Sequence, residues 1–181
     1  MRGGATFEPV DLEIRTERLR LRPLTTADVD TLETILGDPE TMRWYAAPYD
    51  RAGVERWIER SLEAYAANGF GLCAIEELGT GEFLGDAGPN HQSVDGVVHV
   101  ELGWHVRRDR WGEGIATEAG AAWRDWCWSN TDVDHLISLI RPENRQSWRV
   151  AEKLGMTVWR DTVHAGLAHR VYRVDRRPTL S

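Results

Sequence analysis

The chain has 181 residues, of which 41% are hydrophobic and 28% are charged, and these values fit one globular domain with its own core. The net charge of −7 argues against nucleic acid as a principal partner and is mildly favourable to a cationic substrate such as an amine. The two cysteines, Cys73 and Cys127, belong to no CxxC motif or Cys/His cluster, so neither a disulfide framework nor a structural zinc site is expected. No apolar run reaches membrane-spanning length, and the first fifteen residues lack the apolar stretch of a signal peptide. We therefore expect a cytoplasmic protein without a membrane partner.

The first elements of the domain are a strand and two helices. The segment ERLRLRPL, residues 17–24, alternates apolar and charged side chains, which predicts a strand. Amphipathic helices are predicted over residues 25–38 and 49–69. Asp50 is the expected N-cap of the second helix, and Gly69 is expected to end it.

The remaining elements alternate between strands and helices. They are strands over residues 70–77, 82–88 and 96–106, a helix over 115–130, a strand over 135–142, a helix over 144–155, and strands over 156–166 and 168–175. The order β-α-α-β-β-β-α-β-α-β-β predicts an α/β (α+β) fold, with a mixed, mostly antiparallel sheet of about seven strands, about four helices and a central β-α-β unit. We expect residues 16–181 to form this single domain, and residues 1–15 to form a flexible N-terminal arm.

The stretch WGEGIATEA, residues 111–119, joins a predicted strand to a predicted helix. Free backbone N–H groups, the helix dipole and the room left by glycine suit a phosphate or pyrophosphate at such a helix N-terminus. A tight turn explains Gly112 and Gly114 equally well when they are considered alone. The stretch is not a P-loop, and it is not a dinucleotide-binding fingerprint because Thr117 takes the place of the third glycine.

Three segments, in order, resemble one known family. They are RTERLRLRPLTTADVDTL at residues 15–32, ELGWHVRRDRWGEGIATEA at 101–119, and NRQSWRVAEKLGM at 144–156. On these segments the chain resembles the GNAT superfamily of acyl-CoA-dependent N-acetyltransferases, and in particular its RimJ/RimL-like branch. The resemblance extends from about Thr16 to Asp175.

The resemblance implies acetyl-CoA as co-substrate and no metal. It assigns cofactor binding to the loop residues Trp111, Gly112, Glu113, Gly114, Ile115, Ala116 and Thr117, and to Trp104, His105, Val106 and Asn144 along the pantetheine arm. Trp111 stands where the wider superfamily has Gln or Arg, so phosphate binding is expected to depend on backbone amides. The neighbouring Arg107, Arg108 and Arg110 either add positive charge to this site or are solvated loop cations.

Acetyl transfer to an amine needs a base for the amine proton, donors for the oxyanion and a hydrogen bond or proton for the thiolate. Ser147 is the candidate at the thiolate, because its helix contains no tyrosine and, by resemblance, it approaches the sulfur while Asn144 contacts the pantetheine. The alternative is that both residues only cap the helix. Glu101 is the candidate base, because a carboxylate on a central strand beside a cleft has its pKa raised by burial. A structural ion pair explains Glu101 as well, and His105 is the second candidate.

By resemblance, the acceptor pocket is lined by the aromatic residues Trp44, Tyr45, Trp57 and Trp159, although core packing also explains them. The sequence therefore predicts an N-acetyltransferase that moves an acetyl group from acetyl-CoA to a primary amine by direct attack in a ternary complex. The acceptor is a small-molecule amine or a protein N-terminus. The alternative function is a catalytically silent acyl-CoA-binding sensor or scaffold. The resemblance leaves a homodimer open as the oligomeric state.

Overall fold

The structure is a computed structural model that describes residues 12–176. Its strands are β1 (Ile14–Arg15), β2 (Leu19–Pro23), β3 (Cys73–Glu77), β4 (Phe83–Val94), β5 (Val97–Val106), β6 (His135–Ile140), β7 (Thr157–His164) and β8 (Leu167–Asp175). Its α-helices are α1 (Val29–Leu36), α2 (Arg51–Asn68), α3 (Ile115–Asn130) and α4 (Arg145–Lys153). Short 3-10 turns precede α1 at Thr26–Asp28 and follow β5 at Arg108–Arg110.

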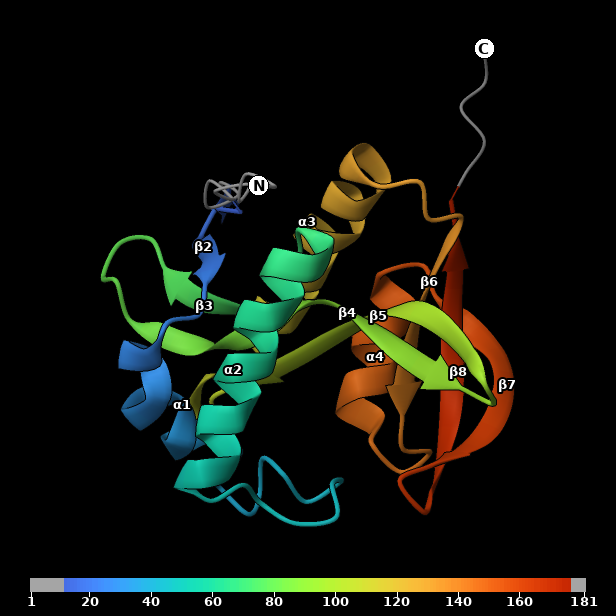
Figure 1. Ribbon diagram of the computed structural model, residues 1–181, viewed down its shortest axis with the longest axis horizontal. Helices are drawn as coiled ribbons and strands as arrows, with labels where there is room; N and C mark the ends of the chain where they lie inside the picture. Colours follow the sequence, from blue (N-terminus) through green and yellow to red (C-terminus); the bar gives the residue numbers. More distant parts are fainter. Residues whose placement is uncertain (1–11, 177–181) are drawn as a thin grey trace, which may run out of the picture.

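The strands form one sheet in the order β1-β2-β3-β4-β5-β6-β8-β7. All neighbours are antiparallel except β5 and β6, which are parallel and are joined through α3. In Figure 1, β2 and β3 lie with α1 on one side of the view, and β6 to β8 lie with α4 on the other. The predicted mixed sheet with a central β-α-β unit and four helices is confirmed.

The sheet has eight strands, not about seven, because the chain enters it earlier than predicted. Ile14 pairs with Leu21, and these two positions anchor β1 to β2. Leu12 is 2% exposed and belongs to the main core. The chain from Leu12 to Arg15 is therefore packed against the domain, and residues 1–11 of the predicted arm lie outside the described residues.

The sheet is buried on both faces, as the alternation of side chains along β3 illustrates. Ile75 belongs to a hydrophobic cluster with Trp123 of α3, on one face. Its neighbour Ala74 belongs to a second cluster with Leu32 of α1 and Ile58 of α2, on the other face. Because successive strand residues point to opposite faces, the helix pairs α1/α2 and α3/α4 cover opposite sides of the sheet.

The helix boundaries follow local chemistry. The carboxylate of Asp50 accepts the N–H of Gly53 at 2.8 Å, and Gly69 ends α2 with a φ of 75°, so both predicted boundaries of this helix are confirmed. No helix in the described part of the chain is long and apolar enough to cross a membrane.

The feature that creates the site is the opening between β5 and β6. Their only register pair is Glu101 with Ile137, and beyond it the two strands diverge. A central sheet that opens in this way leaves backbone polar groups without a neighbouring strand.

Candidate active site

Three side chains satisfy backbone groups along the opening between β5 and β6. The Ser138 hydroxyl donates to the carbonyl of Leu102 at 2.7 Å, and the N–H of Leu139 donates to Oε1 of Glu101 at 3.1 Å. Farther along, the indole N–H of Trp111 donates to the carbonyl of Val106 at 2.7 Å.

These contacts show which residues of β5 turn their backbone N–H and C=O groups toward the opening between β5 and β6. In an antiparallel pair, alternate residues of a strand turn their N–H and C=O to the same side. Since the carbonyls of Leu102 and Val106 both face the gap, the N–H and C=O of Trp104 face it too. The edge of β5 therefore offers one donor and one acceptor to an extended ligand.

The loop that follows β5 ends in a helix with free N–H groups. Gly112 and Gly114 both have a φ of +83°, a left-handed conformation that favours glycine. The first hydrogen bond of α3 runs from the N–H of Glu118 to the carbonyl of Gly114. The N–H groups of Ile115, Ala116 and Thr117 thus have no acceptor within the helix, and the positive end of its dipole lies beside them.

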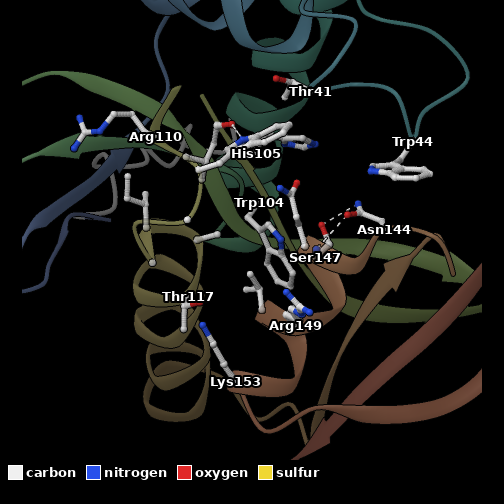
Figure 2. A pocket seen from close by; sticks show the side chains of 18 of the residues that line it. Thr41, Trp44, Trp104, His105, Arg110, Thr117, Asn144, Ser147, Arg149 and Lys153 are labelled. Carbon is white, nitrogen blue, oxygen red and sulfur yellow. Dashed lines mark hydrogen bonds between the residues drawn. The ribbon is translucent and has the colours of Figure 1, made fainter. Parts of the chain in front are cut away.

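The arginines near this loop are neutralised by their neighbours. Arg110 contacts Glu77, Glu82 and Glu113 at 2.7 to 3.0 Å. Arg107 contacts Glu82 and Asp109, each at 2.7 Å. Of the two alternatives for these arginines, added charge is the less favoured for both, because each is already engaged in ion pairs. In Figure 2 the guanidinium of Arg110 points away from the helix N-terminus.

The unpaired cations at this end of the site come instead from α4. Figure 2 shows Lys153 extending from α4 toward the first turn of α3, where Thr117 lies, and Arg149 and Lys153 both line the same cavity as that turn. Neither cation has a carboxylate within 4.0 Å among residues 12–176. They are four residues apart on one face of the helix. This face could have been found from the helical spacing, but it was not predicted.

Two cavities lie along the opening and meet at five residues. The first, of about 370 Å³, contains the α3 N-terminus, the edge of β5 and the cationic face of α4. The second, of about 690 Å³, lies between α2 and the β7–β8 hairpin. The residues that line both are Trp44, Tyr45, Trp104, Asn144 and Ser147. A group bound in either cavity would thus reach the other at this junction.

At the junction, Asn144 and Ser147 are joined by two hydrogen bonds (Figure 2). Oδ1 of Asn144 accepts the N–H of Ser147 at 3.2 Å, which makes Asn144 the N-cap of α4. Nδ2 of Asn144 donates to Oγ of Ser147 at 3.0 Å. A hydroxyl that accepts one hydrogen bond still has its own proton to donate. The helix-cap explanation therefore applies to Asn144, whereas the Ser147 hydroxyl makes no capping bond and is free to donate into the cavity.

Glu101 lines the second cavity. Burial raises the pKa of its carboxyl to about 7, although hydrogen bonds from the N–H of Leu139 and the amide of Asn90 partly oppose the shift. A carboxyl with this pKa is about half ionised at neutral pH, which suits a group that takes up a proton.

A chain of polar groups, of which Asp86 and His105 are buried, approaches the junction from the other side. The Asp86 carboxylate, which is completely buried, lies 2.8 Å from Nδ1 of His105 and accepts the indole N–H of Trp57 at 2.7 Å. Nε2 of His105 lies 2.6 Å from the hydroxyl of Tyr45. Because a carboxylate only accepts hydrogen bonds, the neutral imidazole carries its proton on Nδ1, and Nε2 accepts a hydrogen bond from the Tyr45 hydroxyl.

The comparisons with known proteins bear on this arrangement. Residues 18–157 match the family model described as acetyltransferase (GNAT) domain. The chain belongs to the GNAT acetyltransferase family. It is therefore an acetyl-CoA-dependent acyltransferase, as predicted.

Individual proteins and solved structures are similar to this GNAT chain. An uncharacterized protein of Bacillus subtilis, YkkB, is 34% identical over 142 residues, which cover 78% of this chain and 83% of that protein. The crystal structure of an acetyltransferase from Agrobacterium tumefaciens is 31% identical, with a TM-score of 0.81, and the match covers 97% of this chain and 100% of that one. The structure of RimL, a ribosomal L7/L12 α-N-protein acetyltransferase in complex with coenzyme A, shares the fold at 15% identity, with a TM-score of 0.71 and coverage of 90% and 97%.

Most of the residues predicted to bind the cofactor line the first cavity. The β5 residues Trp104, His105 and Val106 line the first cavity, as do the residues of the glycine loop apart from Glu113. The carboxylate of Glu113 pairs with Arg110 instead, and its backbone carbonyl accepts a hydrogen bond from Arg18. Trp111 uses its indole N–H on β5, so its polar group is engaged within the protein.

Three of the four aromatic residues predicted for the acceptor pocket line the second cavity. Trp44, Tyr45 and Trp57 line the second cavity, but Trp159 lines neither. It is the extra residue of a β-bulge between Val158 and Arg160, and its ring packs against His99 with centroids 5.6 Å apart. A bulge changes which face a side chain occupies, so the prediction for Trp159 was wrong.

Other residues of the site were not predicted. They are Asp86 behind His105, Ser138 on the Leu102 carbonyl, and the cationic residues Arg56, Arg60, Arg141, Arg149 and Lys153 around the two cavities. Within the described residues, no group of three or more His, Cys, Asp or Glu side chains is arranged to hold a metal.

Proposed function

We propose that the protein transfers an acetyl group from acetyl-CoA to a primary amine by direct attack in a ternary complex. The observation that carries the proposal is that the two cavities share lining residues, among them Ser147 and Trp104. A donor in the first cavity and an acceptor in the second would place their reacting groups together without an enzyme-bound intermediate.

The first cavity suits acetyl-CoA at each of its parts. The N–H groups of Ile115, Ala116 and Thr117 would bind the pyrophosphate, and Arg149 and Lys153 would add positive charge. The backbone edge at Trp104 would pair with an amide of the pantetheine arm, in the manner of an added strand.

In the proposed reaction, the amine nitrogen attacks the carbonyl carbon of the thioester. A carbon–nitrogen bond forms and the carbon–sulfur bond breaks, so that the products are an amide and the coenzyme A thiolate. Glu101 takes the proton that the amine loses, directly or through a water molecule. The Ser147 hydroxyl donates a hydrogen bond to the departing thiolate.

His105 is the second candidate for the base. In this alternative, the Tyr45 oxygen accepts the proton that the amine loses, and the Tyr45 hydroxyl passes its own proton to Nε2 of His105. The Asp86 carboxylate would stabilise the resulting imidazolium. We place Glu101 first because it faces the acceptor cavity and its pKa of about 7 suits the task.

Release of free thiol from acetyl-CoA on addition of amines tests the function. An acetyltransferase releases thiol only when a suitable amine is present. A silent acyl-CoA binder would gain melting temperature with acetyl-CoA, because a ligand stabilises the state that it binds, but would release no thiol with any amine. That second result would overturn the proposal of catalysis.

A further inference from the structure

The lining of the second cavity has more arginines than carboxylates, whereas the chain as a whole has more acidic than basic residues. Its lining includes the guanidiniums of Arg56, Arg60 and Arg141 and the carboxylates of Asp50 and Glu101, while the whole chain has a net charge of −7. The Asp50 carboxylate is already engaged as the cap of α2. The excess of positive charge is therefore local to the wall of this cavity.

Arg141 has one carboxylate near its charge, and that contact is a long one. Its side chain is 20% exposed, and the nearest carboxylate, that of Glu143, lies 3.6 Å away, beyond hydrogen-bond distance. Its Nε atom is buried and has no hydrogen-bond partner within residues 12–176. A buried guanidinium N–H without an acceptor costs free energy, so the Arg141 guanidinium, which lines the cavity, has hydrogen-bonding capacity that the described residues do not use.

The position of Arg141 relates it to the reaction. It follows Ile140, the last residue of β6, and lies three residues before Asn144 at the junction of the cavities. Across the cavity, Arg56 and Arg60 are four residues apart on one face of α2. Neither has a carboxylate within 4.0 Å in the described part of the chain. One wall of the cavity thus presents Arg141 close to the junction, and the opposite wall presents two unpaired arginines.

We propose that the acceptor is a small amine that also carries a carboxylate or phosphate group, and that Arg141 binds this anionic group while the amine points to the junction. The proposal rests on the proposed acetyl transfer, because it names the acceptor of that reaction. A guanidinium binds either oxyanion through paired N–H donors. Arg56 and Arg60 add a positive field that attracts such an amine and repels a polycationic one.

The first test compares matched acceptors in the thiol-release assay. L-Phenylalanine is paired with L-phenylalaninamide, and O-phosphoethanolamine with ethanolamine, so that each pair differs in the anionic group and the two pairs separate carboxylate from phosphate. We expect kcat/KM to be at least about tenfold higher for the anionic member of the preferred pair. Equal or better turnover of the neutral members would overturn the proposal.

Variants of Arg141 then test whether this residue causes the preference for the anionic acceptor. Arg141→Gln should lower kcat/KM for the anionic member much more than for the neutral member, so that most of the preference is lost, and Arg141→Lys should retain part of it. Arg170→Gln is the matched control, because Arg170 lies opposite Ile140 on β8 but lines neither cavity. If Arg141→Gln lowers the turnover of both members equally, Arg141 has only a structural role.

A binding measurement separates this proposal from the proposed catalysis. Tryptophan fluorescence of the protein saturated with coenzyme A is titrated with each of the four compounds, because Trp44 and Trp57 line the cavity. An anionic amine should bind at least tenfold more tightly than its neutral partner, and Arg141→Gln should abolish this difference. Binding without thiol release from acetyl-CoA would contradict the catalytic function alone. Absence of any anion-dependent binding would contradict the acceptor class.

Discussion

Replacement of Ser147 by alanine tests the thiolate donor without disturbing the helix that holds it. The N-cap of α4 is Asn144, whose Oδ1 accepts the N–H of residue 147, and this backbone contact survives in Ser147→Ala. The lost hydroxyl accepts only one side-chain hydrogen bond, from Nδ2 of Asn144. We therefore expect the free energy of unfolding to change by less than about 1 kcal/mol.

The expected effect on turnover is larger. A hydrogen bond to a charged group contributes about 1.5–3 kcal/mol, and charge develops on the sulfur only as the carbon–sulfur bond breaks. The loss should therefore appear in kcat, as a roughly ten- to hundred-fold decrease, with the affinity for acetyl-CoA almost unchanged.

The assay measures kcat and melting temperature on the same preparation. Asn144→Ala is the matched comparison, because it removes the helix cap and should lower stability by about 1 kcal/mol. It should also raise KM for acetyl-CoA. A Ser147→Ala protein with normal kcat would refute the assigned role, whatever its stability.

Three further predictions concern the cofactor and the base. Gly114→Val should abolish the rise in melting temperature with coenzyme A, because the φ of +83° at this position disfavours a branched residue and the loop would have to change conformation; unchanged binding would remove the loop from the site. Arg149→Ala combined with Lys153→Ala should raise KM for acetyl-CoA about tenfold or more with little change in kcat, and an unchanged KM would contradict their role. For the parent, kcat should rise with pH through about 7 as the Glu101 carboxyl, whose pKa burial raises to about 7, becomes deprotonated. Glu101→Gln should lower kcat more than coenzyme A affinity and remove this ionisation, while a retained pH profile would favour His105 or a water chain.

The order of elements could be predicted because each has a local signal. The strand β2 alternates apolar and charged residues, and α2 begins at a capping aspartate and ends at a glycine. The structure differs from the prediction at two strands, whose extent is set by pairing with a neighbouring strand and not by the local sequence pattern. The strand β4 continues through Pro89 to the Asp95–Gly96 turn, whereas the prediction ended at residue 88. The short strand β1 exists through its pairing with β2.

The parts of the candidate site that are formed by one contiguous segment could be predicted from the sequence. The parts that need side chains from distant segments could not. The glycine loop and the Asn144–Ser147 turn are contiguous segments with recognisable spacing. In contrast, the carboxylates that neutralise Arg110 come from the distant Glu77 and Glu82. The contact between Asp86 and His105 depends on the register between β4 and β5, and the displacement of Trp159 depends on a β-bulge.

The most direct test of acetyl transfer in a ternary complex is an initial-rate study in which acetyl-CoA and an accepted amine are both varied. The N-acetylated amine and free coenzyme A are quantified together. Double-reciprocal plots that intersect, with one acetylated amine formed for each thiol released, are the predicted result. Parallel plots, or thiol release that is independent of the amine, would contradict direct attack at the junction of the two cavities.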